Sequence, residues 1–204
     1  MRALVIGDIH TEHELLATTL AYGIAVGVDK ILSVGDIVDG PHDPIACIDQ
    51  LRAHRADVVS GNHERWVVEG HPFEAFAYPD AILDWLRELP ATREYDTPTG
   101  RLLLGHGVGA NDMAVLKPDT DGYALECLDP LSSLVRARRH RWFVGGHTHV
   151  PMVRTFGELT VINPGSLVAG QEPGFAVADF GRGEVEHFAL LPSVRRVSMW
   201  RATG

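Results

Sequence analysis

The sequence predicts an α/β fold of four layers, in which two mixed β-sheets pack face to face and helices cover their outer sides. Two observations carry this prediction. Strand-like runs alternate with helical segments in the first half of the chain, and strand-like runs follow one another with few helices in the second half. This order is typical of two packed sheets with outer helices. No repeat, low-complexity tract or linker is present, so we expect a single domain over residues 1–204.

Apolar spacing predicts the elements of the first half. Short, mostly apolar runs typical of strands lie at residues 3–6, 30–34 and 56–60. Apolar residues at helical spacing predict helices at residues 12–22, 44–54 and 82–89. Asp43 is the expected N-cap before Pro44, Asp80 is the expected N-cap of the third helix, and Pro90 is expected to end that helix.

One stretch of the first half, residues 64–79, lacks a clear period. His71-Pro72 and Tyr78-Pro79 interrupt it. We expect a variable, substrate-facing loop there. Trp66 and Tyr78 could stack on a base, although aromatic residues beside prolines more often pack a loop down.

The second half is predicted to be mainly strands. Strand-like runs lie at residues 101–104, 141–144, 152–156, 159–162, 175–180 and 185–191. One helix is expected at residues 130–140, and its cluster of arginines at 136–141 is expected to be a solvated helix end.

Composition limits the classes of function. The 204 residues include 18 Lys plus Arg against 27 Asp plus Glu, a formal charge of -9, which argues against broad nucleic-acid binding. No apolar run approaches the roughly 18 residues of a membrane span, and we expect neither export nor membrane attachment. Cys47 and Cys127 are isolated, as expected of a cytoplasmic protein. A chain of this length can form its core without a structural metal, so a bound metal would serve chemistry.

Five short segments place Asp, Asn or His directly after expected strands, where sites in α/β folds usually lie. They are Gly7-Asp8-Ile9-His10, Gly35-Asp36-Ile37-Val38-Asp39, Gly61-Asn62-His63-Glu64, Gly105-His106-Gly107 and Gly146-His147-Thr148-His149. Residues i and i+2 of an extended backbone share a face, so Asp8 with His10, and His147 with His149, can each converge.

The candidate ligands predict a site for two metal ions. There are seven of them: Asp8, His10, Asp36, Asn62, His106, His147 and His149. Carboxylate, imidazole and amide donors without thiolate suit ions such as Mn²⁺, Fe²⁺ or Zn²⁺. Seven are too many for one ion, whereas two ions that share one carboxylate would each have about four protein ligands.

In this order the five segments match the motifs D-x-H, G-D-x-x-D, G-N-H-[DE], G-H and G-H-x-H. The sequence thus resembles the calcineurin-like metallophosphoesterase superfamily. Asn163-Pro164-Gly165-Ser166 resembles a turn of its small prokaryotic single-domain members, of phosphodiesterase type.

The resemblance implies a role for each motif residue. Asp8, His10 and His149 would hold a first metal, and Asn62, His106 and His147 a second. Asp36 would bridge the two, His63 would protonate the leaving group, and Glu64 would orient His63. Manganese is the preferred ion, with iron, zinc or nickel as alternatives.

The expected function is hydrolysis of a phosphodiester or phosphomonoester of a small soluble substrate. Two divalent ions about 3.5 to 4 Å apart lower the pKa of a bridging water, so that hydroxide can attack phosphorus. Arg65 and His71 are candidate substrate contacts. The oligomeric state is not readable from the sequence.

Three alternatives remain open. Bis-nucleosyl tetraphosphatases and phosphoprotein phosphatases share the motifs, but the latter carry an arginine where this chain has Gly40; Arg65 could replace it. The third is a non-catalytic scaffold, as in the metallophosphoesterase-like subunit of retromer. The presence of His63 and of every ligand position counts against it.

Overall fold

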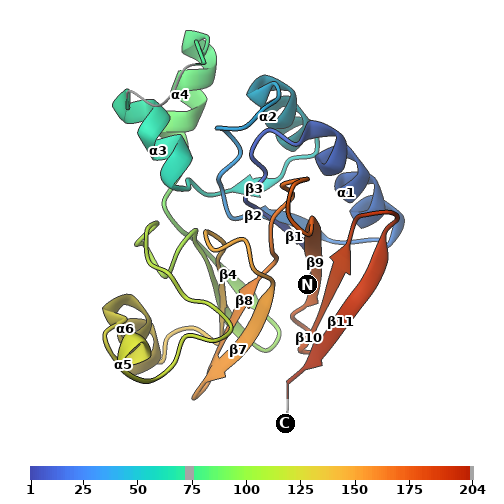
Figure 1. The fold of residues 1–204 in the computed structure, drawn as a ribbon. Helices are drawn as coiled ribbons and strands as arrows, with labels where there is room; N and C mark the ends of the chain where they lie inside the picture. Colours follow the sequence, from blue (N-terminus) through green and yellow to red (C-terminus); the bar gives the residue numbers. More distant parts are fainter. Residues whose placement is uncertain (72–75, 203–204) are drawn as a thin grey trace.

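The computed structural model describes residues 1–71 and 76–202, and two mixed β-sheets form the centre of this part (Figure 1). The first sheet has the strand order β11-β10-β9-β1-β2-β3. Its strands are β1 (Arg2–Ile6), β2 (Lys30–Ser33), β3 (Asp57–Val58), β9 (Gly174–Asp179), β10 (Glu184–Ala189) and β11 (Arg195–Arg201). β1, β2 and β3 run parallel, and β9 is antiparallel to β1. The loops that follow β1, β2 and β3 therefore leave the sheet at the same edge.

The second sheet has the strand order β4-β5-β6-β8-β7. Its strands are β4 (Arg93–Thr97), β5 (Gly100–Leu104), β6 (Trp142–Val144), β7 (Met152–Phe156) and β8 (Leu159–Asn163). β5, β6 and β8 run parallel, while β4 and β7 are antiparallel to their neighbours. This sheet likewise sends the loops after β5 and β6 in one direction.

Six helices cover the sheets in the described part of the chain. They are α1 (His13–Ala25), α2 (Pro44–Ala53), α3 (Asn62–Glu69), α4 (Asp80–Glu88), α5 (Gly122–Glu126) and α6 (Asp129–Ala137). α1 and α2 lie beside the first sheet, and α5 and α6 lie on the side of the second (Figure 1). α3 and α4 contact each other at one end of the molecule. None of these helices is long and apolar enough to cross a membrane.

The alternation of β1 shows how the layers pack. Ala3 and Val5 belong to the apolar cluster between the two sheets, together with residues of β5 and β6. Leu4 and Ile6 point the other way, into a cluster with apolar residues of α1 and α2. A third cluster, around Phe143, joins the outer face of the second sheet to α6. The predicted four-layer α/β sandwich is confirmed.

The predicted loop at residues 64–79 is wrong at its beginning, where α3 runs from Asn62 to Glu69. The helix begins inside the G-N-H-E segment and has only eight residues, too few to show a clear period. Glu64 accepts the N–H of Gly61 at 2.8 Å, and Gly70 ends the helix at φ 70°. Residues 72–75 of the expected loop lie outside the described part.

Helix starts are otherwise close to expectation. The Oδ1 atom of Asp43 accepts the N–H of Ile45 at 2.9 Å, which confirms the predicted N-cap of α2. The prediction for Asp80 is wrong by one position, because Pro79 is the cap residue and Asp80 is the first residue of α4.

Candidate metal centre

The five polar segments meet at one end of the two sheets. The N–H of Asp8, after β1, donates to the carbonyl of Gly35, after β2, at 3.0 Å. The Nδ1 atom of His106, after β5, lies 2.7 Å from the carbonyl of Val34. The N–H of His147, after β6, donates to both carboxylate oxygens of Asp8, at 3.0 and 3.1 Å. The parallel strands of both sheets thus deliver their loops to one place.

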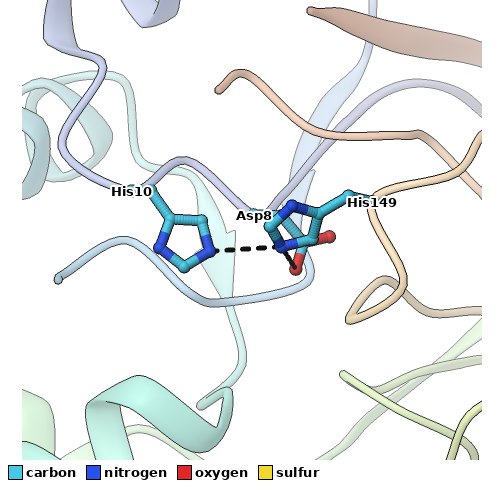
Figure 2. A group of neighbouring side chains, drawn as sticks. All are labelled: Asp8, His10 and His149. Atoms are coloured by element: carbon cyan, nitrogen blue, oxygen red, sulfur yellow. Dashed lines mark hydrogen bonds and ion pairs between the residues drawn. The ribbon is translucent and has the colours of Figure 1, made fainter. Parts of the chain in front are cut away.

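The first group of expected ligands is Asp8, His10 and His149, shown in Figure 2. The Nε2 atom of His149 lies 3.6 Å from Oδ1 of Asp8 and 3.3 Å from Nε2 of His10. The potential ligand atoms of the three side chains all lie within 4.8 Å of one another. Two imidazoles and a carboxylate at this spacing can coordinate one divalent cation.

The second group is Asp36, His106 and His147, with Asn62 beside it. The Nε2 atom of His106 lies 3.1 Å from Oδ2 of Asp36 and 3.0 Å from Oδ1 of Asn62. The same Asp36 oxygen lies 4.0 Å from Nε2 of His10, in the first group. The structure therefore brings all seven expected ligands together and places Asp36 between the two groups.

The backbone at five of these residues is in the left-handed region. The φ angles range from 44° to 66° at Asp8, His10, Asp36, His147 and His149. Residues other than glycine adopt this region rarely and at an energetic cost, and such strain concentrates at functional sites.

Three of the histidines are fixed by hydrogen bonds on the side away from the cluster. Nδ1 of His10 lies 2.7 Å from the carbonyl of Asp39, and Nδ1 of His149 lies 3.0 Å from Oε1 of Gln171. His106 makes the corresponding contact with Val34. A proton on each Nδ1 leaves the lone pair of Nε2 for a metal. Sequence reasoning missed Gln171, which no motif marks.

Burial and charge also fit divalent cations. Asp8 and Asp36 are buried, and their ion pairs among the described residues involve only histidines. Burial raises the pKa of Asp8 to about 7. Burial also opposes ionisation of Asp36, but His106, His63 and His10 outweigh it and lower its pKa. Buried carboxylates need a countercharge, and metal ions held by these donors would supply it.

His63 lies at the edge of the cluster, with Nε2 3.9 Å from Oδ2 of Asp36. Its Nδ1 atom lies 2.8 Å from a carboxylate oxygen of Asp39, although the two groups are not aligned as in a hydrogen bond. Asp39, which the sequence prediction left without a role, is thus the acidic residue next to His63.

Glu64 does not orient His63 as predicted, because its carboxylate is engaged elsewhere. The two oxygens accept the N–H groups of Asp36, Ile37, Val38 and Gly61 at 2.7 to 3.2 Å. Glu64 therefore holds the loop that carries Asp36, and it acts on the cluster through the backbone.

The two candidate substrate contacts have partners within the protein. Arg65 forms ion pairs with Asp112 at 2.7 Å and with Glu69 at 3.2 Å. These carboxylates neutralise its guanidinium and raise its pKa. The ring centroid of His71 lies 5.8 Å from that of Trp66, outside the cluster of expected ligands.

Residues 1–183 match the family model of the calcineurin-like phosphoesterase superfamily domain. Among solved structures, the phosphoesterase Yfce from E. coli is 18% identical over 98% of both chains, with a TM-score of 0.63. An archaeal phosphodiesterase is 14% identical over 93% of this chain and all of that one, with a TM-score of 0.61. Vps29 from Entamoeba histolytica, in complex with Zn²⁺, is 20% identical over 97% of this chain and 98% of that one, with a TM-score of 0.58. These likenesses support the same fold.

Proposed function

The chain belongs to the calcineurin-like phosphoesterase superfamily, and on this basis we propose that it hydrolyses a phosphodiester or phosphomonoester of a small soluble substrate with two divalent metal ions. One observation carries the proposal. All seven expected ligand side chains converge on one end of the two sheets, and His63 lies beside them. A site with two adjacent cations suits in-line displacement at phosphorus.

Each ion has a set of donors. Asp8, His10 and His149 would hold the first, and Asn62, His106 and His147 the second, with Asp36 shared. When bound, the ions would lower the pKa of a coordinated water and neutralise the phosphoryl oxygens. Mn²⁺ is the ion we propose, because carboxylate, imidazole and amide donors suit it; the Vps29 structure holds Zn²⁺.

His63 would supply the proton that an alkoxide leaving group needs. Its backbone N–H donates to Oδ1 of Asp36 at 3.1 Å, and its Nδ1 atom lies beside the carboxylate of Asp39. Nε2 is left to face a substrate held beside Asp36, as a general acid requires.

The surroundings of Gly40 argue against a phosphoprotein phosphatase. A Cβ atom at this position would lie 2.0 Å from the carbonyl oxygen of His10 and 2.4 Å from Oγ1 of Thr11. The loop therefore has no room for an arginine side chain in this conformation. A small substrate held mainly by the metal ions fits this site better.

We propose a cytoplasmic location for the protein. Cys47 and Cys127 are free thiols, which suits a reducing compartment.

The proposal is tested on protein stripped with a chelator and reloaded separately with Mn²⁺, Zn²⁺ and Ni²⁺. The substrates are bis(4-nitrophenyl) phosphate, 4-nitrophenyl phosphate, diadenosine tetraphosphate and a phosphopeptide. We expect turnover of a nitrophenyl ester that depends on added metal. Preference for diadenosine tetraphosphate or the phosphopeptide would favour one of the rival enzymes. No turnover by fully loaded protein would favour a scaffold.

A further inference from the structure

Trp66 differs from the other tryptophans of the chain. Trp142 is buried between the sheets, and Trp85 and Trp200 pack against the apolar clusters. Trp66 is half-buried on α3 and belongs to none of the three clusters that the described residues form. The described ring contacts of Trp66 are with His63 and His71, at 4.7 and 5.8 Å between centroids, so this large, partly exposed ring lies next to the metal centre rather than in a core.

The neighbours of Trp66 connect it to the metal centre. Its ring centroid lies 4.7 Å from that of His63, one turn earlier on α3, with the rings at 68°. His63 in turn lies 4.8 Å from the ring of His10, an expected ligand. His63 thus contacts both an expected metal ligand and Trp66. A leaving group next to His63 would therefore lie close to Trp66.

We propose that Trp66 binds an aromatic ring on the leaving group, so that the preferred substrates are phosphate esters of an aryl alcohol or a nucleoside. This inference rests on the proposed function, because it takes His63 as the residue that faces the leaving oxygen. A flat ring could lie against the indole, and stacking of this kind stabilises a bound base.

The charges around Trp66 favour an uncharged ring. Asp39 is half-exposed beside His63. Arg65, the neighbouring residue on α3, is paired with Asp112 and Glu69. An additional negative charge on the leaving group would therefore meet carboxylates rather than an open arginine. Phenyl and nucleobase rings satisfy this condition, whereas a second phosphate does not.

The kinetic test compares phenyl phosphate with 2,2,2-trifluoroethyl phosphate, or the methyl diesters of the same alcohols if diesters are the better substrates. In Mn²⁺-loaded Trp66→Ala we expect kcat/KM to fall about tenfold for the phenyl ester and to change little for the trifluoroethyl ester. Trp66→Phe should retain most of the activity on the phenyl ester. Tyr123→Ala removes a ring that is 81% exposed on α5 and is the matched control.

A different pattern would overturn the inference. If Trp66 only supports His63, the trifluoroethyl ester should lose at least as much activity as the phenyl ester. Trifluoroethanol is the weaker acid of the two alcohols and depends more on the donated proton. Equal losses on both esters would likewise contradict a role in binding the ring.

A binding measurement separates this inference from the proposed function. Benzylphosphonate and ethylphosphonate are not hydrolysed, and they differ in the ring that replaces the leaving group. By calorimetry on Mn²⁺-loaded protein, Trp66→Ala should weaken the binding of benzylphosphonate about tenfold and leave the affinity for ethylphosphonate unchanged. This result would support the binding site even if the wild type hydrolyses no ester. If the wild type hydrolyses phosphate esters but Trp66→Ala binds benzylphosphonate as tightly as the wild type, the inference is refuted and the proposed function is not.

Discussion

At the scale of single residues, the two acidic side chains near His63 have different tasks. Glu64 accepts four backbone N–H groups and so holds the loop that carries Asp36. Asp39 lies 2.8 Å from Nδ1 of His63. The motif correctly predicted an acidic residue beside His63, but it assigned that role to Glu64, the next residue in the sequence, instead of Asp39. A contact made by a loop 24 positions away along the chain is invisible to a local pattern.

The substitution His63→Ala tests the proposed general acid. We expect both metals to remain and kcat on unactivated alkyl esters to fall by about 10² to 10⁴, because an alkoxide leaves poorly without a proton. A nitrophenyl ester, whose leaving group needs little protonation, should lose much less. Elemental analysis checks the metals, and steady-state rates on both esters check the chemistry. Equal losses on the two substrates would exclude the acid role.

His187 predicts a pH dependence of stability. Its side chain is buried, and its Nε2 and Nδ1 atoms contact the carbonyl of Asn163 and Oγ of Ser198. Burial lowers its pKa below the ordinary value of 6.5. The unfolded chain therefore takes up a proton that the folded protein resists, and stability is lost as the pH falls below about 6.5.

The variant His187→Gln should flatten this part of the stability curve. Urea unfolding of wild type and variant between pH 5 and pH 8 gives the free energies of unfolding. The difference between them should shrink as the pH falls. His54→Gln, at an exposed position of the C-cap of α2, is the control. Parallel curves for His187→Gln and wild type would contradict the assignment.

At the scale of elements, predictability follows burial. β1 and β2 are recognisable because their apolar residues are continuous. β4 and β11 were not predicted, because both are edge strands that expose mostly polar side chains. The short helices α3 and α5 have too few turns to establish a period.

The beginning of α3 predicts a test of how tightly this helix holds the cluster. A Cβ atom at Gly61 would lie 2.2 Å from Oδ1 of Asp36, the carboxylate that we propose the two ions share. Gly61→Ala should displace that carboxylate and weaken binding of both ions by at least tenfold, a loss typical of a disturbed ligand sphere. Metal titration by calorimetry measures the effect.

Gly170→Ala serves as the control for this substitution. A Cβ atom there would have no neighbour within 4 Å, and the backbone is not left-handed. Its metal affinity should equal that of the wild type. If Gly61→Ala also binds both ions normally, the close approach to Asp36 does not constrain the site.

At the scale of the whole molecule, the layers were predictable but the strand order was not. An α/β first half followed by a strand-rich second half indicated two packed sheets. The order β11-β10-β9-β1-β2-β3 depends on pairing between the two ends of the chain, such as Leu4 with Val177, which no local pattern encodes. The family match covers residues 1–183, and a single domain over residues 1–204 stays a prediction.

The candidate site was predictable in part from local motifs, and in part it depends on contacts that only the fold creates. Each ligand type and spacing was readable as a motif, and the structure brings these side chains together. Their role as metal ligands stays a prediction. Gln171 and Asp39 could not be assigned from sequence, because their contacts depend on how distant loops meet.

The central claim is that two divalent ions share Asp36 and that phosphate-ester hydrolysis depends on both. It is tested most directly by counting metal ions and turnover in the same Mn²⁺-loaded preparations of wild type and Asp36→Asn. We expect two ions per chain and hydrolysis of a nitrophenyl ester in the wild type, and loss of both ions and of activity in the variant. Two ions per chain in Asp36→Asn, or a fully loaded wild type that hydrolyses no phosphate ester, would contradict the claim.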